Sequence, residues 1–221
     1  MPVLRRHRRS LGVTNFDTPL LRTLLDAGIG IVSNQVQYSL LDRRPERSLL
    51  ALCRERQVAL LCYGTLGGGF LCKRWLDTPA PEGELANRSL VKYSLIVEEF
   101  GGWEALQELL RVLGAIADKQ HGSIANVAVA WLLARQGVGA AIVGARTASH
   151  AEDNLRVFDV ILDDADNERI DTVLGRHRGP HGDVFGLERE PGSRHAVIMK
   201  TDLNRDSDGS PSCLHGPPEA R

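Results

Sequence analysis

The stretch AAIVGARTASHAEDN, residues 140–154, decides the fold, because it leads from small apolar residues through Gly144 and Arg146 directly into a helical pattern. Residues 138–143 read as a buried strand, and apolar positions keep helical spacing as far as Phe158. A strand followed by a short turn and a helix is one βα unit. Backbone N–H groups at the start of such a helix favour an anion, which raises the question of what Arg146 binds there.

Three more βα units are predicted upstream of this one. Strands are predicted at 11–14, 29–36 and 58–63, and the last is a continuous apolar run of the kind that parallel sheets cover on both faces. Predicted helices begin at Asp17 or Thr18, at Pro45, at Trp103, after a Ser123 cap, and at Asp163 or Asp164. Strand and helix alternate four times, which is typical of an α/β fold with a parallel sheet.

Two regions depart from this rhythm. Residues 64–102 are rich in Gly and Pro and predict a long loop with one helical turn, and loops of that length are usually functional. From residue 176 the chain is rich in Gly, Pro and charge, which predicts an extended tail at 176–221, disordered from about residue 203. We therefore expect a basic arm at 1–10, a folded domain at 11–175 and this tail.

The composition favours a globular domain that acts on a small molecule. The 221 residues include 27 Lys and Arg against 28 Asp and Glu, and 43% of them are hydrophobic. Balanced charge gives no general attraction to nucleic acid or to an anionic membrane. No apolar run approaches the roughly 18 to 20 residues that cross a bilayer. We therefore expect one sizeable core, no nucleic-acid partner and no membrane span.

The cysteines and the first ten residues bear on the cellular compartment. Cys53, Cys62, Cys72 and Cys213 lack the CxxC spacing of a metal site, so we expect reduced thiols, no metal and a cytoplasmic location. Residues 1–10, MPVLRRHRRS, lack a secretory apolar segment and predict an exposed basic arm. An Arg-rich organelle-targeting presequence is the alternative interpretation of this arm.

Two α/β architectures are compatible with the alternation. An open doubly wound sheet carries a Gly-rich phosphate loop after its first strand, but no G-x-G-x-x-G occurs anywhere in the chain. A (β/α)8 barrel instead places its phosphate site after its last two strands, at a helix N-terminus, which fits residues 140–154. We therefore predict a TIM-type (β/α)8 barrel, here a partial barrel of about four βα units.

Short motifs at the predicted strand ends carry a resemblance to a known family. The motifs GVTNF (12–16), SNQVQY (33–38), CYGTLG (62–67) and IVGART (142–147), the last followed by EDN (152–154), resemble those of the aldo-keto reductases for strands five to eight. The resemblance spans roughly residues 10 to 175. It implies the C-terminal half of a barrel that binds NADP(H) at its carboxyl-terminal mouth and reduces an aldehyde or ketone.

The resemblance implies a nicotinamide site at the first three strand ends. The polar side chains of Thr14, Asn15 and Gln35 would hold the carboxamide, and Tyr63 would stack on the ring. Without the resemblance, the same residues read as ordinary strand-end caps and a core aromatic.

The Gly-rich segment after the third strand is the implied pyrophosphate site. Its members Gly64, Leu66 and Gly68 offer backbone N–H groups that can approach a phosphate closely. A run of glycines is otherwise only a flexible loop.

The adenosine end of the cofactor is implied at residues 146–154. A guanidinium at a helix start suits a bidentate contact to the 2′-phosphate of NADP, which is the role implied for Arg146. Asp153 and Asn154 would bind the adenine amino group or ribose, with Thr147 and His150 completing the rim. The alternative is an exposed arginine that only solubilises the loop.

The resemblance also exposes a gap. The catalytic tetrad of the family, an aspartate, a tyrosine, a lysine and a histidine, lies on strands one to four, which nothing before residue 10 supplies. Tyr38 is no substitute, because a phenol that donates a proton at neutral pH needs a nearby cation and no lysine precedes residue 73. We therefore assign no catalytic residue and expect a structural role for Tyr38.

Three interpretations remain open, because four strands leave two sheet edges uncovered. The chain is a shortened form of an NADP-dependent aldo-keto reductase, inactive alone. Alternatively, the half barrel pairs with a second copy or another chain and binds nucleotide without chemistry. In the third interpretation it is an interaction module that uses its exposed edges and binds no cofactor.

Overall fold

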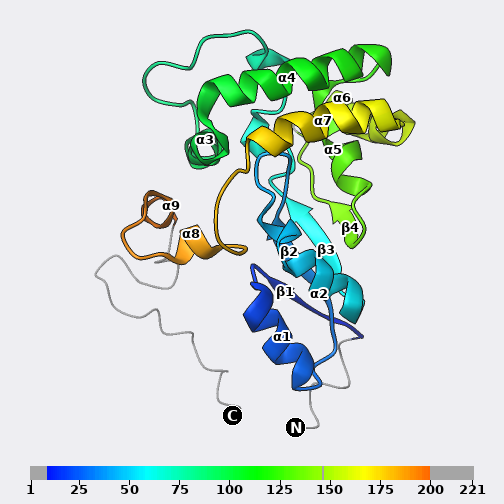
Figure 1. The fold of residues 1–221 in the computed structure, drawn as a ribbon, viewed down its shortest axis with the longest axis vertical. Coiled ribbons are helices and arrows are strands. Elements are labelled where there is room, and N and C mark those ends of the chain that lie inside the picture. Colours follow the sequence, from blue (N-terminus) through cyan, green and yellow to red (C-terminus); the bar gives the residue numbers. More distant parts are fainter. Residues whose placement is uncertain (1–8, 146, 200–221) are drawn as a thin grey trace, which may run out of the picture.

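A parallel four-stranded sheet forms the centre of the computed structural model, which describes residues 9–145 and 147–199 (Figure 1). The strands are β1 (Leu11–Thr14), β2 (Ile31–Gln37), β3 (Ala59–Tyr63) and β4 (Val138–Ala141), in the order β1-β2-β3-β4. Each neighbouring pair is parallel. The four predicted strands are confirmed, and their ends differ only slightly from the predicted ones.

One face of the sheet is buried more deeply than the other. In β3, Leu60 and Cys62 are fully buried in the core, whereas Leu61 and Tyr63 on the opposite face are half-buried. Because the apolar run of β3 is continuous, we predicted that this strand is covered on both faces of the sheet. This prediction is wrong, because one face of β3 is only half-buried. Right-handed βα connections place the helices on the outer face, so the half-buried face is the one that lines the inside of a closed barrel.

The helices around the sheet begin at the predicted caps. The Asp17 side chain accepts a hydrogen bond from the Leu20 amide at 2.9 Å, and Ser123 and Asp163 both form capping boxes. The segment after Pro45 is split into a short 3₁₀ helix and α2, where one helix was expected. The elements concerned are α1 (Thr18–Asp26), η2 (Arg44–Glu46), α2 (Leu49–Arg56), α4 (Gly102–Lys119), α5 (Ile124–Leu133), α6 (Ala148–Leu155), η5 (Arg156–Asp159) and α7 (Asp164–Arg176).

The segment predicted as a long loop, 64–102, contains a complete helix instead. Two 3₁₀ turns, η3 (Gly67–Gly69) and η4 (Lys73–Trp75), precede α3 (Arg88–Phe100). Asn87 caps α3 by accepting a hydrogen bond from the Leu90 amide at 3.0 Å. The buried residues of α3 follow helical spacing and pack on the core: Leu90, Tyr93, Ile96, Val97 and Phe100. The Gly and Pro content of the first half of the segment concealed this period.

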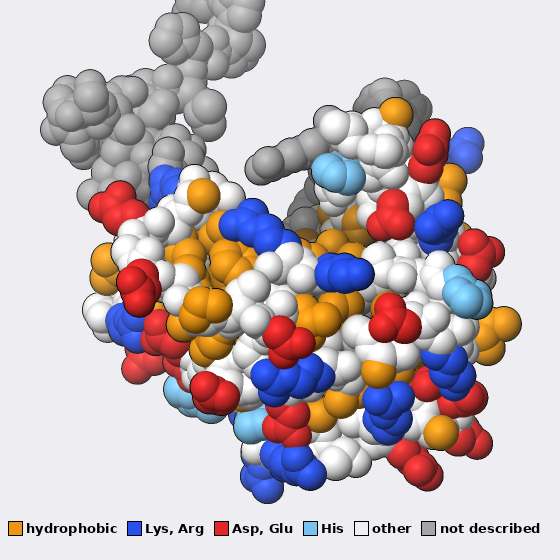
Figure 2. Space-filling model, turned by 90° about the horizontal axis from the view of Figure 1, so that it is seen from above, with side chains coloured by type: hydrophobic (Ala, Val, Ile, Leu, Met, Phe, Trp, Pro, Cys, Tyr) orange, Lys and Arg blue, Asp and Glu red, His pale blue; other side chains and the backbone are white. Residues whose placement is uncertain are grey.

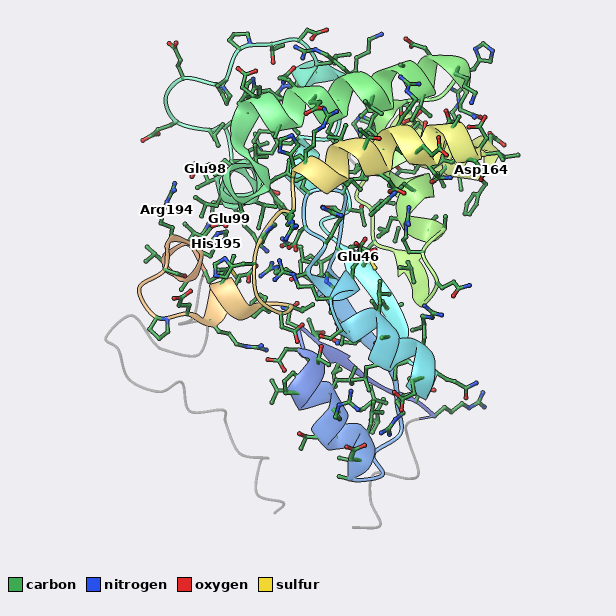
Figure 3. The ribbon with its side chains drawn as sticks, in the orientation of Figure 1. Glu46, Glu98, Glu99, Asp164, Arg194 and His195 are labelled. Carbon is green, nitrogen blue, oxygen red and sulfur yellow. The ribbon has the colours of Figure 1, made fainter. Side chains whose placement is uncertain are left out.

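The chain after α7 also differs from the predicted extended tail. Residues 177–199, here called the C-terminal strap, carry α8 (Gly186–Arg189) and α9 (Arg194–Val197). Figure 3 shows Arg194 and His195 beside Glu98 and Glu99 of α3, and Arg194 Nη1 donates to Glu98 Oε2 at 2.5 Å. The Nε2 of His195 lies 3.4 Å from Glu99 Oε1. The strap therefore packs back on the domain.

A buried ion cluster fastens the strap to the segment after β2. Arg44 donates to Asp42 at 2.9 and 2.7 Å and to Glu188 at 2.8 and 2.9 Å. All three side chains are almost completely buried. Burial by itself raises the pKa of Glu188, but the hydrogen bonds and charge of Arg44 outweigh it and hold that pKa below its ordinary value.

No helix within residues 9–145 and 147–199 combines the length and hydrophobicity that a membrane crossing requires. Within the same residues, no group of three or more His, Cys, Asp and Glu side chains is arranged to hold a metal ion.

Candidate functional site

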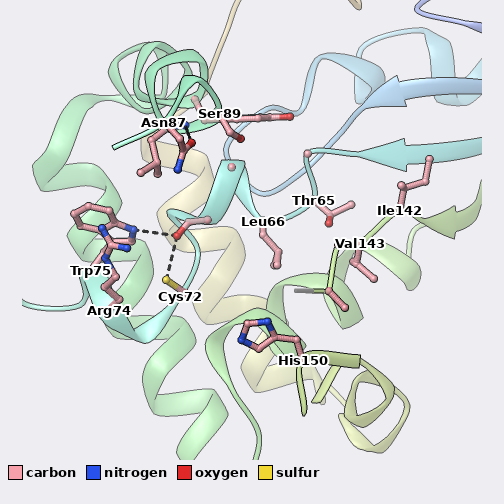
Figure 4. A pocket seen from close by; sticks show the side chains of 17 residues that line it. Thr65, Leu66, Cys72, Arg74, Trp75, Asn87, Ser89, Ile142, Val143 and His150 are labelled. Atoms are coloured by element: carbon pink, nitrogen blue, oxygen red, sulfur yellow. Dashed lines mark hydrogen bonds between the residues drawn. The ribbon is translucent and has the colours of Figure 1, made fainter. Parts of the chain in front are cut away.

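A cleft of about 670 Å³ opens at the carboxyl ends of β3 and β4 (Figure 4). One wall is the loop after β3, and the other is the turn from β4 into α6. Four of the residues predicted to bind a cofactor line this cleft: Gly64, Leu66, Gly68 and His150. The ends of parallel strands and the start of a helix meet here, which is where α/β proteins bind phosphorylated ligands.

The Gly-rich loop on one side of the cleft is held in a fixed shape. Gly64, Gly67, Gly68 and Gly69 all have φ between 54° and 104°, a range that favours glycine. The amides of Gly67 and Gly69 donate to carbonyls within the loop, at 2.9 and 3.0 Å. These two amides are thus used internally, and a phosphate would have to be bound by others in the loop.

Tyr93 of α3 lies against this loop. A Cβ atom added to Gly64 or Gly68 would lie within 3.0 Å of the Tyr93 side chain, closer than real Cβ atoms come to other atoms. At Gly69, in contrast, a Cβ would meet nothing within 4 Å. Close packing of Tyr93 therefore explains why glycine occupies positions 64 and 68. The predicted approach of a pyrophosphate is a second reason for glycine at these positions.

The other wall of the cleft leads into α6. Thr147 caps this helix by accepting a hydrogen bond from the His150 amide at 3.3 Å, and Asn154 Nδ2 donates to the carbonyl of Gly144 at 3.4 Å. The carbonyl of Asp153 accepts from Asn126 Nδ2 at 2.8 Å, which ties α6 to α5. The predicted set Thr147, His150, Asp153 and Asn154 is thus brought together on one short helix. Arg146 lies outside the described residues.

The residues predicted to hold the nicotinamide gather on the inner side of the sheet. Thr14 and Gln35 are paired in register, and the Asn15 amide donates to the Gln35 carbonyl at 2.8 Å. Asn15 has φ 56°, and its Oδ1 accepts a hydrogen bond from the Tyr63 hydroxyl at 2.8 Å. None of these four residues lines the cleft, whereas Gly64, which follows Tyr63 directly, does.

The pKa of each tyrosine in this chain is raised above its ordinary value. Burial, with Glu188 next, raises the pKa of Tyr63 to about 12, although the hydrogen bond to Asn15 acts in the opposite direction. Burial likewise raises the pKa of Tyr93 and that of Tyr38. Tyr38 is fully buried and donates to Glu46 at 2.7 Å, which supports the structural role expected for it. These are the three tyrosines of the sequence.

One lysine approaches two of these rings. The Nζ of Lys92 in α3 lies 5.4 Å from the ring centroid of Tyr63 and 5.2 Å from that of Tyr93. Burial lowers the pKa of Lys92, while the carboxylates of Glu188 and Asp42 oppose that effect. Lys92 thus stands over both rings, and the pKa of each phenol is raised all the same.

Sequence reasoning missed part of the cleft lining. Arg74, Asn87 and Ser89 also line it, and the Arg74 guanidinium lies 4.4 Å from the ring centroid of Trp75. Within the part of the chain that the structure describes, Arg74 forms no salt bridge. The sequence feature that could have indicated Arg74 is the pair of basic residues just after the glycines. The feature that could have indicated Asn87 is the helical spacing of the apolar residues that follow it in α3.

Comparison with known proteins agrees with this geometry. The profile of the Aldo/keto reductase family matches residues 8–174. Flagellar radial spoke protein 5 of Chlamydomonas reinhardtii is 32% identical over 126 residues, 56% of this chain and 24% of that protein. Aldo-keto reductase yakc [NADP(+)] of Schizosaccharomyces pombe is 30% identical over 171 residues, 76% of this chain and 47% of that protein.

A solved structure also supports the predicted fold. The glycerol dehydrogenase of Gluconobacter oxydans superposes with a TM-score of 0.63 at 25% identity, over 79% of this chain and 51% of that one. The predicted partial (β/α)8 barrel is thereby confirmed. The chain spans half or less of the length of the curated relatives it matches.

Proposed function

This chain belongs to the aldo/keto reductase family, and from that premise we propose that it corresponds to strands five to eight of the barrel and binds NADP(H) at their carboxyl ends. The cleft at the ends of β3 and β4 carries the proposal. Its volume, about 670 Å³, falls in the range of small-molecule sites, and a Gly-rich loop faces a capped helix start across it.

The phosphates occupy this cleft in the proposed complex. Arg74 and His150 line it, and both side chains can donate hydrogen bonds to phosphate oxygens. Arg146 follows the lining residue Ala145 in sequence. A guanidinium there supplies the paired donors that a 2′-phosphate accepts, which supports a preference for NADPH over NADH. The name of the Schizosaccharomyces pombe relative includes NADP(+), which fits the same preference.

The nicotinamide is proposed to lie on the inner side of the sheet. Thr14, Asn15 and Gln35 present polar groups there, and Tyr63 offers an aromatic ring beside them. When bound, the nicotinamide supplies a hydride from its C4 atom to the carbonyl carbon of an aldehyde or ketone. The residues of this chain orient the ring for that step, and the tetrad of a complete barrel supplies the proton.

A second candidate function is nucleotide binding without catalysis. A proton donor at neutral pH needs a pKa near that pH, and all three tyrosines have a pKa that is raised. This observation favours a single chain that holds a cofactor and does not reduce a carbonyl compound. A relative named as a flagellar radial spoke protein supports a use of this family outside metabolism.

The test is a fluorescence titration of the purified chain with NADPH and, in parallel, with NADH. We expect saturable binding with tighter affinity for NADPH. Absence of binding by a chain with a folded circular-dichroism spectrum would contradict the cofactor proposal. Assays with short aldehydes decide between the two candidate functions. Turnover by the single chain would show that catalysis does not require the half of the barrel that carries the tetrad.

A further inference from the structure

The sheet ends in two unpartnered strands. Within the described residues, β1 pairs only with β2 and β4 pairs only with β3, so each has a row of backbone groups without a strand beside it. Unprotected edges of this kind promote pairing with another chain. All four strands point the same way, so the free side of β4 and the free side of β1 can join in a parallel pair.

Exposed apolar side chains concentrate at these two edges. Of the eleven large hydrophobic side chains that are exposed in the described residues, six belong to β1, to the end of β4 or to the helices that follow these two strands. Leu11 and Leu20 belong to β1 and α1, whereas Ile142 and Val143 directly follow β4 and Leu155 and Phe158 belong to α6 and η5. Seen from above, from the end where α3 and α4 lie, the molecule also shows hydrophobic side chains on a hollowed face (Figure 2). Clustering of this kind marks an interaction surface.

The β4 end carries a groove for a neighbouring element. A cavity of about 350 Å³ runs along Gly139 and Ala140 of β4, between α5 and η5. Leu155 and Phe158 line it and are 66% and 76% exposed, so the single chain leaves its rim uncovered.

The β1 end presents a matching apolar residue. Relative to the buried Leu21, Leu20 and Asp26 lie on opposite sides of α1. Asp26 accepts a hydrogen bond from Arg56 of α2 at 2.6 Å, so its side of α1 faces α2. Leu20 therefore faces away from α2, toward the position where the helix of an adjoining βα unit packs in a barrel.

We propose that a second copy of this chain covers both edges, with β4 of each copy pairing with β1 of the other. Eight parallel strands close a barrel of this type, and each copy contributes four. A two-fold rotation about the barrel axis turns one half into the missing half and keeps every strand parallel. It also forms the β4–β1 contact twice, as closed two-fold assemblies require. A copy of the same chain thus satisfies the strand number, direction and closure together.

This assembly has a consequence for the cofactor sites. Because the two-fold axis runs along the strands, both clefts open at the same end of the closed barrel. The inference rests on the barrel fold and on the edges, and it stands whether or not the cleft binds NADP(H).

The experiment measures the mass of the 221-residue chain by light scattering over a wide concentration range. We expect twice 24.2 kDa. Replacing both Leu155 and Phe158 by Asp should convert the dimer to a single chain, because two charges then face the partner. Val197→Asp is the matched control, since Val197 on α9 is 74% exposed and belongs to neither edge strand nor to the helices that follow these strands. It should leave the dimer intact.

Hydrogen exchange identifies which surfaces meet. In the proposed dimer the amides of β1 and β4 exchange slowly, and both strands lose protection together in the double variant while circular dichroism stays that of a folded chain. A single-chain mass for the folded wild type would overturn the proposal. So would a dimer that the double variant leaves unchanged, or one in which β4 alone is protected, since that indicates pairing of β4 with β4.

Discussion

At the scale of single residues, the glycines of the loop after β3 are constrained from inside the protein. The Tyr93 side chain occupies the space where a side chain at Gly64 or Gly68 would begin. The φ angles of Gly68 and Gly69 are both positive, 64° and 104°, but only Gly68 has Tyr93 against it. A substitution at Gly69 therefore measures backbone strain alone, whereas the same substitution at Gly68 measures backbone strain plus collision with Tyr93.

Gly68→Ala should destabilise the protein more than Gly69→Ala. Both substitutions impose backbone strain of about 1–2 kcal/mol, and Gly68→Ala adds an overpacking cost of about 1–3 kcal/mol. Urea unfolding of the two variants measures the difference. Equal losses would mean that Tyr93 moves aside freely and that the loop is not held by it.

Arg146 and Arg74 should differ in which cofactor they affect. Arg146→Ala should weaken NADPH about 10- to 100-fold and NADH little, because a charge-assisted contact of about 1.5–3 kcal/mol is made only to the 2′-phosphate. Arg74→Ala should weaken both cofactors alike, because Arg74 lies at the loop where the shared pyrophosphate is proposed.

Parallel titrations of the two variants with NADPH and NADH test this pattern. Arg169→Ala, an exposed residue of α7, is the control and should change neither affinity. Equal loss of NADPH and NADH in Arg146→Ala would remove the proposed 2′-phosphate contact.

At the scale of elements, the strap depends on one buried carboxylate. Glu188→Gln leaves Arg44 without the full charge of one partner inside the protein, and breaking a buried pair in this way costs about 3–5 kcal/mol. The free energy of unfolding at neutral pH should fall by about that amount. Glu190→Gln, on the exposed residue just after α8, should have little effect.

The same carboxylate should make stability depend on acid pH. The pKa of Glu188 is lower in the folded chain than its ordinary value, so below about pH 4.3 the unfolded chain binds more protons than the folded one. The contribution of Glu188 to stability should therefore be fully present above that pH. It should be lost as the pH falls through the pKa that Glu188 has in the folded chain. Chemical unfolding from pH 7 to pH 3 measures the loss, and Glu188→Gln should lack the part due to this group.

The elements differ in how far the sequence predicted them. The strands and the caps Asp17, Ser123 and Asp163 follow from local patterns, because apolar runs and cap residues act over a few positions. Helix α3 was missed because glycines and prolines dominate the first half of its segment, although Tyr93, Ile96 and Phe100 keep helical spacing. The strap was missed because its main anchor joins Glu188 to Arg44, far away in the sequence.

The candidate site was predicted in part for similar reasons. Gly64, Leu66 and Gly68 belong to the loop that follows β3, and His150 lies in the first turn of α6; such positions can be read from the pattern. Arg74, Asn87 and Ser89 reach the same cleft only through the path of the chain between β3 and α3. The local sequence pattern does not predict the path that the chain takes between β3 and α3.

At the scale of the whole molecule, the uncovered edges make stability depend on protein concentration. A partner that binds only the folded state raises its stability by mass action. The melting temperature of the wild type should therefore rise with concentration, whereas that of the Leu155→Asp and Phe158→Asp double variant should not. Scanning calorimetry at several concentrations checks this. A constant melting temperature for the wild type would argue for a chain that folds without its second copy.

The ion cluster at Arg44 has a consequence for the order of events during synthesis. Arg44 and Glu188 are separated by 144 residues, and a ribosome adds about 5–20 residues per second. Arg44 therefore leaves the ribosome on the order of ten seconds before the carboxylate that completes its burial. Until then, the first two strands and the segment after β2 lack their final cover, so this domain completes its folding only after nearly all of it has been translated.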